Sequence, residues 1–141
     1  MQDLTVVSKR LLEALNRHDI DALVDCFHPD VRSESPTQPE RGYRGREQLR
    51  AYWAAILEED GADLKAKLLR CFADADTACS EWCWQGTRRD GTSFARAGVL
   101  IYGVRDERIA WMRLYMEPIQ GEAETVADWV LHELAMRPVQ P

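Results

Sequence analysis

Three side chains in this sequence are candidates for a general acid or base: His28, Glu34 and Glu117. Glu117 follows Arg113 and Tyr115 at spacings of two, and a β-strand places such alternate residues on one face. On that face, Arg113 would orient the Glu117 carboxylate and Tyr115 would donate a hydrogen bond to a substrate. The pattern therefore offers a catalytic interpretation of this strand.

Each of the three candidates also has a purely structural interpretation. The Arg113, Tyr115 and Glu117 stripe is equally typical of an outer sheet face, either solvated or in a dimer interface, and only a bulge would turn Glu117 inward. His28 follows a predicted helix, where a protonated imidazole is stabilised by the helix dipole. Glu34 reaches a pocket only if its strand shifts register by one residue.

A second group of candidates is apolar and is expected to face the interior of the sheet. These pocket-lining candidates are Trp53, Trp82, Trp84, Val99, Ile101, Met112, Leu114 and Met116. They either fill the core or line a pocket for an aromatic or polycyclic molecule, for which tryptophan and methionine offer a large adaptable surface. By the same alternation, Glu81 and Arg96 are expected to face outward.

Composition and motifs exclude several functional classes. The net charge of −6 argues against nucleic acid or an anionic membrane as a partner. There is no apolar run of membrane-spanning length, and the N-terminal residues lack the pattern of a signal peptide. We find no nucleophile motif, no glycine-rich phosphate loop and no metal-ligand spacing, so neither a cofactor nor a metal is expected.

The four cysteines do not form a recognisable motif. Cys79 and Cys83 lie in one predicted strand, where their Cα atoms would be roughly 13 Å apart, too far for a disulfide. We therefore expect buried, reduced thiols and a cytoplasmic protein.

Periodicity predicts one domain over residues 1–141, with its core at about 4–118. Helices are expected at about 4–17, 20–27, 46–59 and 122–136. Strands are expected at about 30–35, 63–72 and 77–88, followed by a hairpin at 98–118. The proline- and glycine-rich stretch 35–45 is expected to be a loop, and Asp90-Gly91 is a hairpin signal.

Helices followed by an antiparallel meander indicate the α+β class. We expect a curved antiparallel sheet that wraps around the N-terminal helices as a cone with an apolar pocket. A homodimer through the outer sheet face is expected, because Trp111, Arg113 and Tyr115 lie on that side. The sequence leaves open whether the C-terminal helix covers that face within its own chain.

Three stretches of the chain resemble the nuclear transport factor 2-like superfamily, and within it the SnoaL-like polyketide cyclase branch. They are HDIDALVDCFHPDV at 18–31, GREQLRAYW at 45–53, and VRDERI with RLYMEP at 104–118. The resemblance implies a cofactor-independent protein that binds a hydrophobic small molecule, either as an isomerase, cyclase or hydratase, or as a non-catalytic binding or dimerisation module. The superfamily hosts many activities, so the fold alone does not choose among them.

Ketosteroid isomerase, one member of this superfamily, provides a direct comparison. It uses a carboxylate base and an oxyanion hole of one tyrosine and one protonated aspartic acid. In an ungapped overlay these three groups fall on Ser35, Leu11 and Val99. None of these residues supplies the required group, so the resemblance excludes steroid isomerisation by that mechanism.

Overall fold

The computed structural model describes residues 3–59, 63–119 and 125–136. The helices are α1 (Thr5–Arg17), α2 (Ile20–Asp25), the 3-10 turn η1 (Pro39–Arg41), α3 (Arg46–Glu59) and α4 (Val126–Ala135). The strands are β1 (Phe27–Glu34), β2 (Tyr43–Arg44), β3 (Lys65–Asp74), β4 (Thr77–Thr87), β5 (Ser93–Arg105) and β6 (Arg108–Pro118). The predicted α+β class is confirmed.

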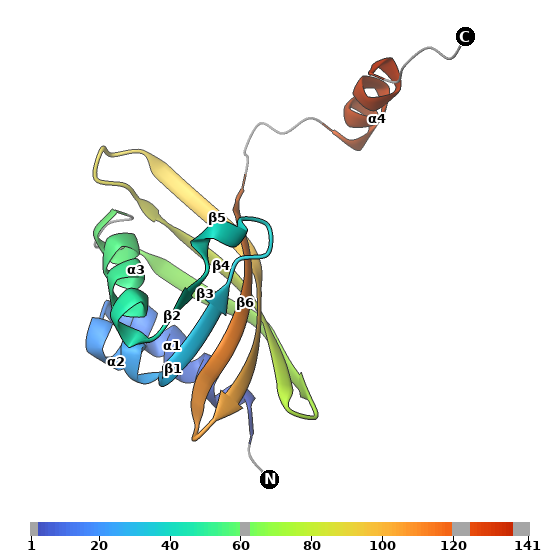
Figure 1. Ribbon diagram of the computed structural model, residues 1–141. Coiled ribbons are helices and arrows are strands. Elements are labelled where there is room, and N and C mark those ends of the chain that lie inside the picture. The colour runs from blue at the N-terminus through green and yellow to red at the C-terminus, as the bar shows by residue number, and fades with distance from the viewer. Residues whose placement is uncertain (1–2, 60–62, 120–124, 137–141) are drawn as a thin grey trace.

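The strands form a single curved sheet in the order β2-β1-β6-β5-β4-β3 (Figure 1). β3 to β6 form the predicted antiparallel meander. β1 begins at Phe27, about three residues before the predicted start, and it pairs with β6 in parallel. Pro29 is tolerated inside β1 because the pairing is irregular between Phe27 and Arg32.

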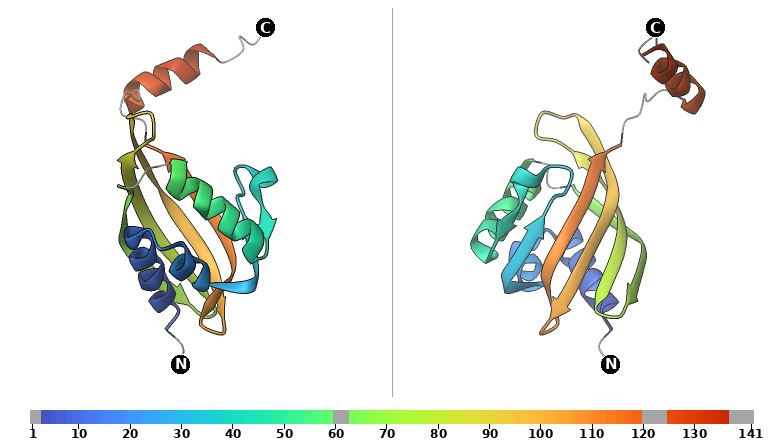
Figure 2. Two further views of the ribbon diagram at one scale, coloured as in Figure 1. Left: turned by 90° about the vertical axis from the view of Figure 1, so that its left-hand side faces the viewer. Right: turned by 45° about the vertical axis from the view of Figure 1, so that its right-hand side comes forward.

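The helices α1, α2 and α3 cover one face of the sheet, which we call the inner face, and none of the described helices covers the opposite face (Figure 2). α1 turns its apolar stripe, including Val7, Leu11 and Leu15, into the core. Together the sheet and helices make the predicted cone, whose narrow end lies near the β5–β6 turn.

Local signals in the sequence explain where the first two helices end and begin. His18 has a positive φ of 54° and closes α1, and its ring hydrogen-bonds the Leu64 carbonyl oxygen at 2.9 Å. Asp19 then caps α2, because its carboxylate accepts a hydrogen bond from the Ala22 amide at 3.1 Å.

Buried polar groups deep in the cone are paired with one another. The Tyr102 hydroxyl donates to the Leu4 carbonyl oxygen at 3.0 Å and lies 2.6 Å from the Ser8 hydroxyl. On the neighbouring strand, the Trp82 indole N–H donates to the Ser80 hydroxyl at 2.8 Å. Because an unpaired buried polar group is costly, these bonds keep the deep core stable.

α4 stands apart from the sheet, and all of its described residues are exposed (Figure 1). It falls within the helix predicted at about 122–136, of which residues 122–124 lie outside the described residues. Its apolar side chains include Trp129, which is 52% exposed, and Leu131, which is 66% exposed. Over the described ranges, no helix has the length and apolar character needed to cross a membrane.

Candidate binding recess at the mouth of the cone

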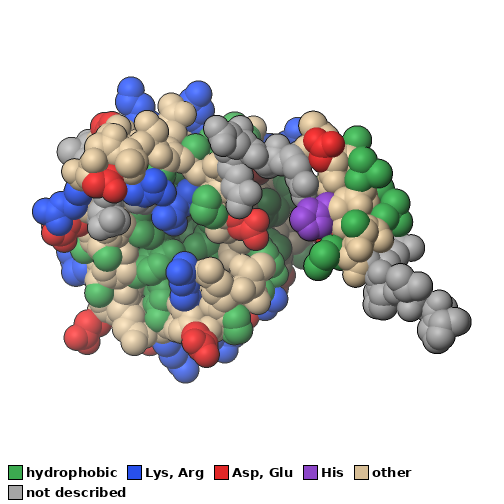
Figure 3. All heavy atoms as spheres, turned by 90° about the horizontal axis from the view of Figure 1, so that it is seen from above, with side chains coloured by type: hydrophobic (Ala, Val, Ile, Leu, Met, Phe, Trp, Pro, Cys, Tyr) green, Lys and Arg blue, Asp and Glu red, His purple; other side chains and the backbone are tan. Residues whose placement is uncertain are grey.

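The wide end of the cone, opposite the β5–β6 turn, holds a small recess. Its lining comes from the β1–β2 loop, α3, β4, β5 and β6: Ser35, Thr37, Gln38, Arg41, Tyr52, Trp84, Arg96, Leu114 and Met116. Seen from above, hydrophobic side chains lie in a hollow at this end, and Lys or Arg side chains lie at its rim (Figure 3). The free volume of the recess is about 30 Å³, since side chains fill most of the cone.

Two aromatic residues line the recess, Tyr52 of α3 and Trp84 of β4, and the Trp53 ring contacts both of them. The Trp53 and Trp84 ring centroids are 5.5 Å apart, and Tyr52 lies edge-on to Trp53 at 5.6 Å. The Trp53 and Trp84 side chains are almost fully buried, at 3% and 4% exposure. Nevertheless, neither indole N–H has a hydrogen-bond partner within the described residues.

Arg96 lies beside Trp84 and lines the recess, so the expectation that Arg96 faces outward is wrong. The two residues are directly paired across β4 and β5, and paired residues share a face of the sheet. The Arg96 Nε atom is buried and, among the described residues, has no partner.

The apolar stripe of β6 forms the opposite wall. Met112, Leu114 and Met116 pair with Tyr102, Leu100 and Gly98 of β5, and the stripe faces inward. Gly98 allows β6 to approach closely, since a Cβ at this position would collide with the Tyr115 carbonyl oxygen. Met112 lies deep and is 2% exposed, while Leu114 and Met116 reach the recess.

Val99 and Ile101, the other two proposed lining residues, lie on the outer face. They pair with Glu81 and Cys79 of β4, which alternate with the buried stripe of that strand. The cause is the length of the β4–β5 connection, residues 88–92. A two-residue turn at Asp90-Gly91 would pair Trp84 with Ala97 rather than Arg96, and a one-residue shift exchanges the faces of β5.

Glu34 and Arg113 form an ion pair of 2.6 Å on the outer face. The Arg113 guanidinium also donates to the Tyr115 hydroxyl at 3.3 Å. Hydrogen bonding to Tyr115 and attraction to the Glu34 carboxylate raise the pKa of Arg113. Glu34 thus faces away from the recess, paired opposite Arg113 of β6.

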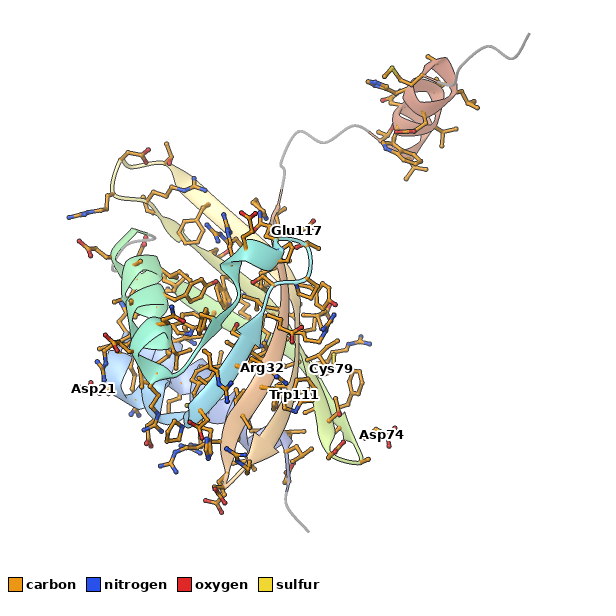
Figure 4. The ribbon with its side chains drawn as sticks, viewed as in Figure 1. Asp21, Arg32, Asp74, Cys79, Trp111 and Glu117 are labelled. Carbon is orange, nitrogen blue, oxygen red and sulfur yellow. The ribbon has the colours of Figure 1, made fainter. Side chains whose placement is uncertain are left out.

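Glu117 lies on the same outer face, near the end of β6 that leads to the C-terminus (Figure 4). It pairs with Ala97, whose neighbours Arg96 and Gly98 occupy the inner stripe. Arg113 contacts Glu34 and Tyr115, so the proposed Arg113–Glu117 interaction is not among its contacts.

His28 lies at the narrow end, roughly 20 Å along β1 from the recess. Its ring contacts Arg105, with N···N separations of 3.1–3.3 Å, and lies 3.6 Å from the Asp106 carboxylate. The structure therefore separates His28 from both glutamates and from the apolar lining.

Two larger hollows open on the outside of the molecule. One, of about 550 Å³, lies between α1 and the β5–β6 turn, and the other, of about 770 Å³, lies beside the β4–β5 hairpin. Their lining includes none of the buried polar atoms without partners in the described part of the chain. This distinguishes the recess, although it is the smallest of the three. No cluster of metal-ligating side chains occurs among the described residues.

The sequence predictions missed Arg96 and the loop residues Ser35, Thr37, Gln38 and Arg41 as parts of the site. Arg96 is two strand positions from Gly98 and directly opposite Trp84, so the correct hairpin register would have identified it. The loop residues carry no periodic signal, because their position depends on where the loop folds back over the cone.

The chain belongs to the SnoaL-like domain family, whose model matches residues 8–112. Among curated proteins, none matches the chain significantly. The family match and the cone place it in the nuclear transport factor 2-like superfamily, as the sequence resemblance implied.

Solved structures with the same fold share little sequence with this chain. RV0760c from Mycobacterium tuberculosis, in complex with estradiol-17β-hemisuccinate, is 21% identical with a TM-score of 0.68, covering 81% of this chain and 94% of that one. TsrD from Streptomyces laurentii is 22% identical with a TM-score of 0.70, covering 83% and 92%. A computationally designed 17-OHP binder is 18% identical with a TM-score of 0.68, covering 84% and 100%. At these identities the likeness shows the fold alone.

Proposed function

We propose that this protein binds a hydrophobic small molecule in the recess at the mouth of the cone, without a cofactor. The observation that carries this proposal is the combination of an apolar floor with buried N–H groups that lack partners, at Trp84 and Arg96. Two neighbours of the same fold, the RV0760c complex and the designed 17-OHP binder, are described by the steroids they bind, which supports the small-molecule class.

Binding without catalysis accounts for the site better than an isomerase, cyclase or hydratase. Within the described residues, the lining of the recess contains no carboxylate and no histidine. The three acid–base candidates lie elsewhere, with Glu34 and Glu117 on the outer face and His28 at the narrow end. A general base must come within hydrogen-bond reach of its proton, so this placement supports a binding role.

The recess must enlarge before it can hold an aromatic ligand. A free volume of about 30 Å³ is far below the roughly 300 Å³ at which small-molecule pockets begin. An aromatic ligand therefore requires the β1–β2 loop and the Arg96 and Met116 side chains to move outward. Loop and rotamer movements of this kind are common on binding.

The test uses N-phenyl-1-naphthylamine, a neutral probe whose fluorescence rises in an apolar site. We expect saturable binding to the full chain, and loss of binding in Leu114→Lys, which places a charge in the recess. Leu69→Lys is the matched control, because Leu69 is 55% exposed on β3. Circular dichroism checks the fold of each variant. Met116→Gln is a second variant of the recess, and it adds a polar group without adding a charge. Absence of saturable binding, or equal binding in wild type and folded Leu114→Lys, would contradict the proposal.

We also propose a homodimer through the outer sheet face. Support comes from Trp111, Arg113 and Tyr115 on that face and from exposed Phe72 on β3. Arginine and aromatic residues are enriched in interfaces. Light scattering at micromolar concentration should give twice the chain mass, and Trp111→Glu should lower it to the monomer; a monomeric wild type refutes this proposal.

A cytoplasmic location is proposed for the protein as well. The four cysteines are free thiols, and free thiols are typical of a reducing compartment.

A further inference from the structure

We propose that the recess is selective for molecules that carry a carboxylate on a hydrophobic body, with Arg96 and the Trp84 indole N–H as the groups that bind it. This inference rests on the proposed binding function and names the chemical class of its ligand. It goes beyond apolar fit, because it assigns the polar end of the ligand to two named donors.

Trp84 supplies the first part of the argument. Its side chain is 96% buried, it lines the recess, and its N–H has no acceptor among the described residues. Leaving a buried donor unpaired costs about 1–3 kcal/mol, so native proteins rarely do so without a reason. A ligand oxygen in the recess would supply the missing acceptor.

The nearby Trp82 shows that this protein does provide an acceptor for a buried indole N–H elsewhere on the same strand. Trp82 is two residues earlier on the same face of β4, and Ser80 accepts its N–H at 2.8 Å. At Trp84 the position directly across the hairpin is occupied by Arg96, which is itself a donor with no acceptor atom. Two residues that line one recess therefore each carry a buried donor without a partner among the described residues, and neither donor can satisfy the other.

The charges around the recess select an anion from among the acceptors. Arg41 and Arg96 both line it, and within the described residues neither forms an ion pair. The described residues of the lining include no carboxylate, although the whole chain has a net charge of −6. A neutral carbonyl would satisfy the indole N–H, but only an anion also neutralises the partly buried guanidinium. A cationic ligand would be repelled.

The shape of a carboxylate fits these donors. A guanidinium presents N–H groups in a planar fork that matches the two oxygens of a carboxylate. The remaining lone pairs of the carboxylate can accept the Trp84 N–H. Leu114 and Met116, on the opposite wall, contact the hydrophobic body of the ligand.

The experiment compares two probes of the same shape, 1-naphthaleneacetate and its neutral amide 1-naphthaleneacetamide, by titration calorimetry on the full chain. We expect the carboxylate to bind at least roughly tenfold more tightly, because hydrogen bonds to charged groups are the stronger ones. Arg96→Met should lower carboxylate affinity by about the same factor and leave amide affinity unchanged.

Arg89→Met is the matched control, because it removes the same charge from an exposed side chain whose ion-pair partner among the described residues is the exposed Glu58. It should leave both affinities unchanged. Arg96→Lys keeps the charge without the fork and should give an intermediate carboxylate affinity. It also serves as the second variant if Arg96→Met does not fold.

The outcomes separate this inference from the proposed function. If wild type binds both probes with equal affinity, or if Arg96→Met weakens both equally, carboxylate selectivity is overturned while hydrophobic binding stands. If neither probe binds and N-phenyl-1-naphthylamine also fails, both proposals are overturned.

Discussion

Trp82 and Trp84 lie two residues apart on the same face of β4, and both are at least 96% buried. Trp82 belongs to the deep end of the cone, where Ser80 accepts its N–H. Trp84 belongs to the mouth, where its N–H has no partner among the described residues. The inner face therefore contains two regions. In the deep end, the Trp82 N–H donates to Ser80. At the mouth, the Trp84 and Arg96 donors have no acceptor among the described residues.

The largest expected effect is a difference in stability between matched tryptophan variants. Trp82→Phe should lower the free energy of unfolding by about 3 kcal/mol, because it loses ring contacts and a buried hydrogen bond. Trp84→Phe should cost about 1 kcal/mol less, since the Trp84 N–H bonds to no described residue. Urea unfolding followed by circular dichroism measures both. Equal losses, or a larger loss at Trp84, would remove the distinction between deep end and mouth.

A second prediction concerns Tyr102 in the deep end. Tyr102→Phe should lower the free energy of unfolding by about 1–3 kcal/mol at neutral pH, because it leaves Ser8 and the Leu4 carbonyl oxygen without their partner.

This cost should depend on pH. Burial raises the pKa of Tyr102, opposed by the hydrogen bond with Ser8, so the folded protein keeps a phenol proton that the unfolded chain releases above about pH 10. The contribution of Tyr102 is fully present below that pH and is lost as the pH rises. The stability difference between wild type and Tyr102→Phe should therefore narrow from pH 9 to pH 11. A constant difference contradicts this explanation.

The smallest expected effect is on the stability of an arginine variant at the mouth. Arg96→Met should change the free energy of unfolding by less than about 1 kcal/mol, because no bond within the described residues is lost. The comparison variant is Arg46→Met, whose guanidinium donates to the Phe27 carbonyl oxygen at 3.0 and 2.6 Å. That variant should lose about 1–3 kcal/mol. Chemical denaturation measures the free energy of unfolding of both variants. An equal loss in Arg96→Met and Arg46→Met would contradict the prediction.

Local patterns in the sequence were sufficient for much of the fold. The helical spacing of Leu11 and Leu15, the Asp19 cap and the alternation of β6 each encode their own structure within a few residues. The inward orientation of Met112, Leu114 and Met116 was predicted and is confirmed by the β5–β6 register. The parallel pairing of β1 with β6 was not predicted, because it joins segments far apart in the chain.

The site was less predictable, because it depends on register and on pairing between distant groups. Trp53 and Trp84 were proposed as lining, and the structure brings them into contact, with Trp84 in the recess itself. Val99 was placed inward and Arg96 outward because one residue in the hairpin connection decides the faces of β5. No sequence pattern indicates that the Trp84 and Arg96 donors lack partners among the described residues. An unpaired donor can be recognised only when the positions of all its neighbours are known.

The most direct test of the difference between the two regions is to follow the indole N–H signals by two-dimensional proton–nitrogen NMR during titration with 1-naphthaleneacetate. Trp82→Phe and Trp84→Phe assign the two signals. We predict that the Trp84 indole proton moves downfield as it acquires an acceptor, while the Trp82 proton, already bonded to Ser80, stays in place. A Trp84 signal that does not move at saturation, or a Trp82 signal that moves as far, would contradict the assignment of the mouth as the binding site.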